Sequence, residues 1–140
     1  MKVLLGDTIS VLLQQALRGL SLRQQVISNN LANISTPGFK ASEVIFESEL
    51  RRALEAKQED RVALRTTHPA HFSASPSSAL EVRPIIRERS ETTLRADGNN
   101  VDLEREMTML VETAIRYQAS AQVLSRKLAL LRTIITEGRK

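Results

Sequence analysis

The chain has 140 residues, the length of one ordinary domain, and only 3% of them are aromatic. With 3 Phe, 1 Tyr and no Trp, a core has to be built from aliphatic side chains, which suits packed helices better than a thick β-sandwich. Cysteine is absent, which excludes disulfides and thiolate metal sites. The formal net charge of +4 raises nucleic acid and anionic membranes as partners.

The distribution of the charge argues against those partners. The clearest basic excess consists of Arg83, Arg87, Arg89 and Arg95. These arginines alternate with glutamates and have no aromatic side chains between them, so we interpret them as a solvated strip of mixed charge. No apolar run is long enough to span a bilayer, and the short apolar patch before Gly6 is too short for a secretory signal.

A first helix is predicted from about Asp7 to Ala32. Its apolar residues recur at steps of four and three, which is typical of a packed helix face, with Gln24 as the one polar interruption. They are Leu13, Leu17, Leu20, Ile27 and Leu31. Asn33 is expected to stop the helix in a left-handed conformation. After an extended Thr36, Pro37 and Gly38 suit the central pair of a type II turn.

The middle of the chain has weaker patterns. Phe39 to Ile45 is predicted to be extended, and residues 46–60 return to helical spacing. Residues 61–98 contain three prolines and a serine-rich run, which favour loops with short strands near 62–66 and 82–87. His68 and His71 lie in these loops with a proline between them, so we interpret them as loop residues and expect no metal site.

The C-terminal part carries the strongest periodic signal. Residues 97–100 are expected to form a turn, and Asp102 is expected to cap a long helix of about 50 Å. The apolar residues of this helix repeat in steps of four and three without a break. They are Leu103, Met107, Leu110, Ala114, Tyr117, Ala121, Leu124, Leu128, Leu131 and Ile135.

Together these elements predict one mainly α-helical unit. Its parts are an N-terminal helical segment (1–35), a middle with a turn, a short helix, loops and short strands (36–98), and a C-terminal helical segment (99–140). A lone helix of this length cannot bury its own apolar stripe, so we expect the two terminal helices to pack as a coiled-coil-like pair, either antiparallel or crossed.

Residues 29–40 read N-N-L-A-N-I-S-T-P-G-F-K, which resembles the N-terminal signature of the bacterial flagellar rod, hook and hook-associated proteins. The segments 46–54, 64–72 and 97–104 resemble the short proximal rod proteins of this family, rather than hook proteins with their longer middles. The resemblance implies a structural, non-enzymatic subunit that assembles with its own copies and with other rod subunits into the torque-transmitting shaft.

The resemblance also implies where this subunit lies and what it meets. Its place is the periplasmic rod of the basal body, reached through the flagellar type III export apparatus without a cleaved signal. Its further partners are the basal MS-ring and the small rod adaptor. The assembly residues are expected to be the leucines and isoleucine of the first helix, the signature residues Asn30, Asn33, Thr36, Pro37, Gly38 and Phe39, and the large side chains of the last helix from Leu103 to Leu131.

Three other readings compete with this one. The first is a different rod protein of the same family. The second is a basic helical nucleic-acid-binding protein, which would need its cationic side chains on one helix face. The third is an enzyme, but there is no glycine-rich phosphate loop, and Glu104 and Glu106 lie on different sides of their helix. We therefore expect no catalysis, no cofactor, no nucleic acid and no membrane insertion.

Overall fold

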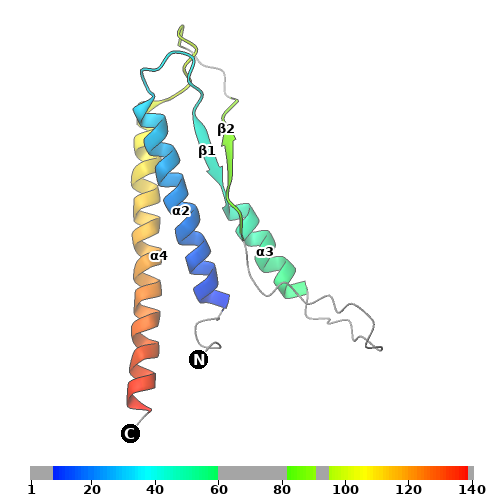
Figure 1. Ribbon diagram of the computed structural model, residues 1–140, viewed down its shortest axis with the longest axis vertical. Helices are drawn as coiled ribbons and strands as arrows, with labels where there is room; N and C mark the ends of the chain where they lie inside the picture. The colour runs from blue at the N-terminus through cyan, green and yellow to red at the C-terminus, as the bar shows by residue number, and fades with distance from the viewer. Residues whose placement is uncertain (1–7, 60–81, 91–94, 139–140) are drawn as a thin grey trace, which may run out of the picture.

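The computed structural model describes residues 8–59, 82–90 and 95–138. Its elements follow in the order α2 (Thr8–Ala32), β1 (Ser42–Ile45), α3 (Glu47–Glu59), β2 (Ile85–Glu88) and α4 (Leu103–Glu137) (Figure 1). The prediction of a mainly helical chain with long terminal helices, a short third helix and short strands is confirmed. The strand expected near 62–66 and both histidines lie outside the described residues.

Helices α2 and α4 lie side by side and run antiparallel (Figure 1). Of the two arrangements left open by the sequence, the chain therefore adopts the antiparallel one. Helix α4 has 35 residues and α2 has 25, so α4 continues past the start of α2. Asp102 caps α4 as predicted, because its Oδ1 accepts from the backbone N–H groups of Glu104 at 2.9 Å and Arg105 at 3.3 Å.

The two strands form an antiparallel pair in which Ser42 lies opposite Glu88 and Val44 opposite Ile86. Strand β1 lies between α2 and β2, and β2 lies on the side away from α2 (Figure 1). Side chains alternate between the two faces of a strand, so Val44 and Phe46 point the same way, and both are buried. They form a small core with Leu20, against which Leu22 and Val26 pack.

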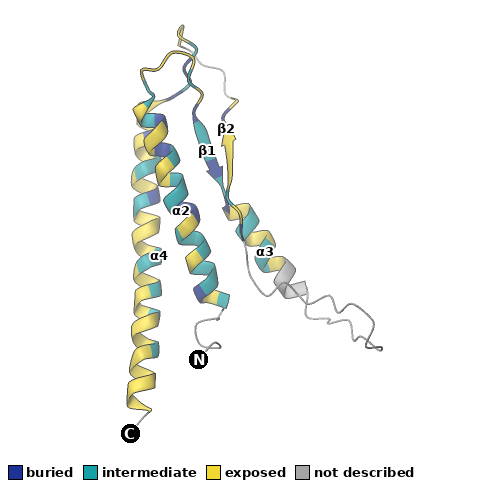
Figure 2. Cartoon of the chain, viewed as in Figure 1, coloured by how far each residue is buried: buried dark blue, intermediate teal, exposed yellow. Residues whose placement is uncertain are grey.

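The face of α4 that meets α2 differs from the predicted one. The fully buried residues of α4 are Glu106 and Thr113, whereas Leu103, Met107, Leu128 and Ile135 are 54%, 46%, 42% and 52% exposed. The buried and half-buried positions of α4 are 106, 109, 110, 113, 114, 120, 121, 124, 127 and 131, which include only five of the ten predicted positions. Figure 2 shows that burial is concentrated in the half of α4 next to its N-terminus.

Gly19 is the point of closest approach between α2 and the chain that follows β1. A Cβ atom built at Gly19 would lie 2.5 Å from two carbon atoms of the Phe46 ring. Glycine lowers helix propensity, so its presence within α2 has a packing reason: only a residue without a side chain lets the ring of Phe46 reach its buried position.

We expect Gly19→Ala to lower the free energy of unfolding by about 1 to 3 kcal/mol, because the added methyl group forces Phe46 out of place. Ser28→Ala, at an exposed position of the same helix, is the matched control and should leave stability within about 0.5 kcal/mol of the parent. Thermal or urea unfolding followed by circular dichroism measures both. A stabilised Gly19→Ala would show that helix propensity outweighs the contact.

Candidate assembly site at the interhelical junction

The two sequence motifs at the helix ends lie against each other in the fold. We call the pairing of residues 33–41 with residues 95–101 the interhelical junction. Its backbone bonds run from the Gly38 N–H to the Asp97 carbonyl at 2.8 Å and from the Asn100 N–H to the Phe39 carbonyl at 3.3 Å. The junction therefore ties the end of α2 to the start of α4 through main-chain atoms.

Asn99 is the centre of the junction and is fully buried. Its Nδ2 donates to the carbonyl oxygens of Asn33 at 2.9 Å, Ile34 at 3.1 Å and Thr36 at 2.9 Å. Its Oδ1 accepts from the Val101 N–H at 2.7 Å. The carbonyl acceptors lie in the non-helical chain that follows α2, so one carboxamide satisfies that segment and also holds Val101, the residue before the α4 cap.

Asn100 closes the end of the two-stranded sheet. Its Oδ1 accepts from the Ala41 N–H at 2.6 Å, and its Nδ2 donates to the Arg89 carbonyl at 3.0 Å. Ala41 and Arg89 lie opposite each other, one step beyond the paired strands, and the Arg89 N–H donates to the Ala41 carbonyl at 2.8 Å. The Asn100 carboxamide thus completes the pairing of these two residues and joins the sheet to the start of α4.

The turns of the junction are partly as predicted. The Phe39 N–H donates to the Thr36 carbonyl at 3.3 Å and Gly38 has φ 72°, so Pro37 and Gly38 are the central pair of a turn with the positive angle that type II requires. The left-handed conformation expected for Asn33 is wrong, because no described residue other than glycine has positive φ. Asn33 instead uses its Nδ2, which donates to the Asn29 carbonyl at 2.8 Å.

The second turn lies earlier than predicted. The Gly98 N–H donates to the Arg95 carbonyl at 3.1 Å, so the turn spans residues 95–98, and Asn99 and Asn100 lie after it, where they bond across the junction. The Asn99 N–H donates to Asp97 Oδ1 at 3.1 Å, and this bond, helped by the charge of Arg95, lowers the pKa of the Asp97 carboxyl below its usual value. Asp97 therefore stays ionised at neutral pH and holds the turn.

Below the junction, a buried polar triad joins α2, β2 and α4. It consists of Asn30, Arg89 and Glu106, which are 0%, 6% and 0% exposed. Arg89 donates to Glu106 Oε1, and Asn30 Nδ2 donates to Glu106 Oε2 at 3.0 Å. The expectation of a solvated basic strip is wrong for Arg89, because β2 carries its side chain between the helices, where the charge of Glu106 compensates it.

The edge of β1 that faces α2 is closed by side chains of that helix. The Asn30 carboxamide bonds both to the Ser42 N–H, at 3.0 Å, and to the Ser42 carbonyl, at 2.8 Å. About two turns before Asn30 in α2, Arg23 donates to the Val44 carbonyl at 2.9 Å. Asn30 therefore acts as a strand residue would, and α2 takes the place of a third strand.

Arg23 also anchors the start of α3. It forms two bonds of 2.6 Å with the Glu47 carboxylate, and its guanidinium lies 4.7 Å from the centre of the Phe46 ring. Partial burial by itself would raise the pKa of Glu47, but the hydrogen bonds and charge of Arg23 outweigh it and hold the pKa below its usual value. Glu47 is thus an ionised partner of Arg23 at neutral pH.

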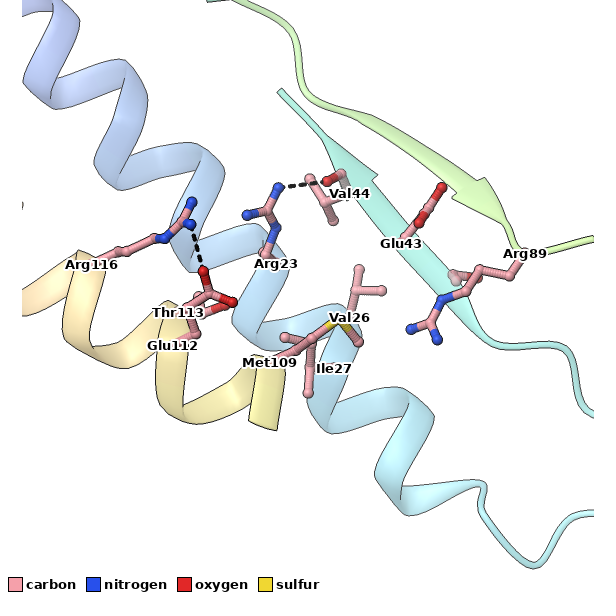
Figure 3. Close-up of a pocket in the computed structure, with 11 residues that line it drawn as sticks. Arg23, Val26, Ile27, Glu43, Val44, Arg89, Met109, Glu112, Thr113 and Arg116 are labelled. Atoms are coloured by element: carbon pink, nitrogen blue, oxygen red, sulfur yellow. Dashed lines mark hydrogen bonds and ion pairs between the residues drawn. The ribbon is translucent and has the colours of Figure 1, made fainter. Parts of the chain in front are cut away.

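A groove of about 140 Å³ lies between α2, β1 and α4, with arginine side chains on three sides (Figure 3). Each of these arginines is paired with a carboxylate: Arg23 with Glu47, Arg89 with Glu106 and Arg116 with Glu112. The pairing neutralises the groove, so it offers no concentrated positive charge for a phosphate group. Within the described ranges, no group of three or more potential metal-ligating His, Cys, Asp or Glu side chains comes together.

The predicted assembly residues separate into three sets. Three are buried in the fold: Leu20, Ile27 and Asn30. A second set is half-buried along the α2–α4 contact and the junction: Leu13, Leu17, Leu31, Asn33, Phe39, Leu110, Leu124 and Leu131. The third set is exposed: Thr36, Pro37, Gly38, Leu103, Met107, Tyr117 and Leu128.

Sequence reasoning missed the residues that connect the motifs. Asn99 and Asn100 were assigned to a turn, and Glu106 was considered only as a possible catalytic acid beside Glu104. The available signal was Glu106 itself, since positions 106, 110, 113 and 117 also follow the three and four spacing and would bring this carboxylate onto the packed face. A charge at such a position requires a buried partner, which is Arg89.

The junction and the helices on either side define the class of protein. Residues 13–40, which cover most of α2 and nearly all of the first segment of the junction, match the family model described as flagella basal body rod protein. Among the described residues, none of the helices combines the length and apolarity that a membrane crossing needs.

Relatives are similar in sequence to this chain over most of its length. The flagellar basal body rod protein FlgB of Bacillus subtilis is 33% identical over 127 residues, which cover 91% of this chain and 92% of the relative. FlgB of Salmonella typhimurium is 32% identical over 127 residues, covering 89% and 91%. FlgB of Borreliella burgdorferi is 37% identical over 105 residues, covering 74% and 78%. The chain belongs to the FlgB family of flagellar basal body rod proteins.

Asn99→Asp should lower the free energy of unfolding by about 3 kcal/mol, because a carboxylate cannot donate to the three carbonyls and its charge faces their oxygen atoms. Gln25→Glu, the same amide-to-carboxylate change at an exposed position of α2, should change it by less than about 0.5 kcal/mol. Urea unfolding provides the measurement. Equal effects of the two changes would mean that the Asn99 bonds do not hold the junction.

Glu106→Leu should destabilise the fold by about 3 to 5 kcal/mol, since it leaves the buried Arg89 without its counter-charge. The double variant Arg89→Met, Glu106→Leu should be more stable than the single one, because no buried charge remains. Glu104→Leu, at an exposed position of the same helix, is the control and should leave the stability nearly unchanged. If the double variant were as unstable as the sum of both single ones, the two charges would act independently.

Proposed function

We propose that this chain is a structural subunit of the proximal rod of the bacterial flagellar basal body. In this role it would assemble with copies of itself and with other rod subunits into the shaft that transmits motor torque. Membership of the FlgB family supports the place, and the exposed apolar surface of α4 supports the assembly. A rod built from many parallel helix contacts transmits torque mechanically, so no catalytic group is needed.

The single observation that carries the proposal is the outer face of α4. Leu103, Met107, Val111 and Ile115 follow one another at steps of four and are 54%, 46%, 56% and 62% exposed. Helix α2 covers a different face, which contains Glu106 and Thr113. A row of large apolar side chains on one exposed helix face is typical of a surface that another protein covers.

More apolar side chains are exposed toward the end of α4. Leu130, Ile134 and Ile135 are 62%, 58% and 52% exposed. Identical subunits that repeat a contact between different surfaces form an open helical array when the rotation does not close. We assign the assembly role to these outer residues and to the exposed signature residues Thr36, Pro37 and Gly38, while the buried Leu20, Ile27 and Asn30 support the fold.

Further partners follow from the same proposal. They are the basal MS-ring, the rod adaptor protein and the flagellar type III export apparatus, with the mature subunit in the periplasmic rod and no cleaved signal. The three segments 1–35, 36–98 and 99–140 would act as one structural unit, because the junction joins the first to the last. Cryo-electron microscopy of basal bodies that carry a tagged copy would test this: tag density at the membrane-proximal rod is expected.

Ile115→Asp should block assembly and swimming while the subunit still folds, because the substituted side chain is exposed in the isolated chain. Ser28→Asp introduces the same charge at an exposed position of α2, outside this row, and should retain swimming. Both variants are expressed in a strain that lacks this chain and scored by soft-agar motility and by counts of basal bodies. Normal swimming of the Ile115 variant would contradict the role of this face.

A further inference from the structure

The two edges of the small sheet differ in their hydrogen bonding. In an antiparallel pair, residues alternate between those that bond to the opposite strand and those whose N–H and C=O groups point away from it. The Arg89 N–H bonds to the Ala41 carbonyl, so Glu43 with Arg87 and Ile45 with Ile85 are the bonded pairs. The backbone groups of Ser42 and Val44 therefore point away from β2, toward α2.

Contacts of β1 confirm this alternation independently. Both backbone groups of Ser42 bond to Asn30, and the Val44 carbonyl bonds to Arg23, so this edge is occupied by α2. By the same alternation, the N–H and C=O groups of Ile86 and Glu88 point out from the other edge. No described strand pairs there, because the sheet has only the order β1-β2 within the described residues.

The side chains along this edge are also uncovered. Ile85 and Ile86 are 52% and 54% exposed, although Ile86 lies opposite Val44, which is 4% exposed and belongs to the core. The apolar surface of the core thus continues to the open edge and ends in solvent. Natural proteins usually blunt such an edge or use it, because it presents a template for another strand.

We propose that the outer edge of β2 accepts an extended strand from a neighbouring subunit of the rod. The open groups are backbone N–H and C=O groups in alternation, which an extended backbone can satisfy and a helix cannot. The inference rests on the proposed function, because it names a contact within the rod.

The side chains along this edge also indicate which residues the incoming strand carries. An apolar side chain opposite Ile86 would extend the surface that begins at Val44. Glu88 lies on the same face and makes no ion pair with a described residue, whereas Arg87 on the opposite face is paired with Glu43 at 2.6 Å. The incoming strand therefore carries an apolar side chain at Ile86 and a basic one beside Glu88.

A second copy pairing through its own β2 fits this edge less well. Centred on Ile86, a two-fold pairing would place Pro84 opposite Glu88, and proline has no N–H to donate. Each flanking pair would lose one of its two bonds, and strands of four residues bury far less area than a stable dimer needs. In a rod, many neighbouring contacts add to such a small one.

Proline substitutions at neighbouring positions distinguish the two edges. Ile86→Pro removes only an outward N–H and is compatible with an edge strand, so the purified variant should unfold at the same temperature as the parent. Ile85→Pro removes an N–H that bonds to β1 and should lower the unfolding temperature. Ile86→Val keeps both the N–H and the branched shape and is the control for assembly.

In a strain that lacks this chain, Ile86→Pro is expected to reduce assembled rods about tenfold, the effect of one lost backbone bond at the upper end of its usual strength, while Ile86→Val swims normally. Rods and swimming equal to those of Ile86→Val would overturn the inference. So would a destabilised Ile86→Pro subunit, or a soluble dimer of the purified parent that Ile86→Pro abolishes. Swimming by the strain without any copy would instead refute the proposed function.

Discussion

The structure depends on one buried carboxamide. Asn99 holds three carbonyl acceptors of the chain that leaves α2, those of Asn33, Ile34 and Thr36, and fixes Val101, the residue that precedes the α4 cap. These carbonyl groups lie just after α2, outside regular structure, and their donor comes from a residue 63 to 66 positions later in the chain. The direction of both long helices is thereby set at one point, with α4 returning along α2.

The polar triad of Asn30, Arg89 and Glu106 lies next to the junction on the same two helices. A buried ion pair contributes little net stability, because desolvation of both charges offsets most of their attraction. It is sensitive to position, however, since a shift of α4 by one residue would remove Glu106 from both Arg89 and Asn30. We therefore interpret the triad as a device that sets the register of α2, β2 and α4, more than as a source of stability.

The distribution of burial separates the subunit into a folded end and an open end. Next to the junction, the helices, the sheet and Phe46 pack together, whereas most large apolar side chains in the far half of α4 are exposed (Figure 2). A subunit whose apolar surface exceeds what it can cover alone is suited to assembly, because neighbouring copies supply the missing contacts. The fold at the junction keeps that surface in a defined orientation.

The sequence by itself determined the elements and the family. Spacings of three and four define both long helices, Asp102 begins α4, and Pro37-Gly38 places the turn, because these depend on neighbouring residues along the chain. Only the tertiary structure decided which helix face is covered, and it brought Asn99 to the end of α2 and Arg89 to Glu106. Those contacts join residues far apart in sequence, and local spacing carries no information about which distant polar group will satisfy another.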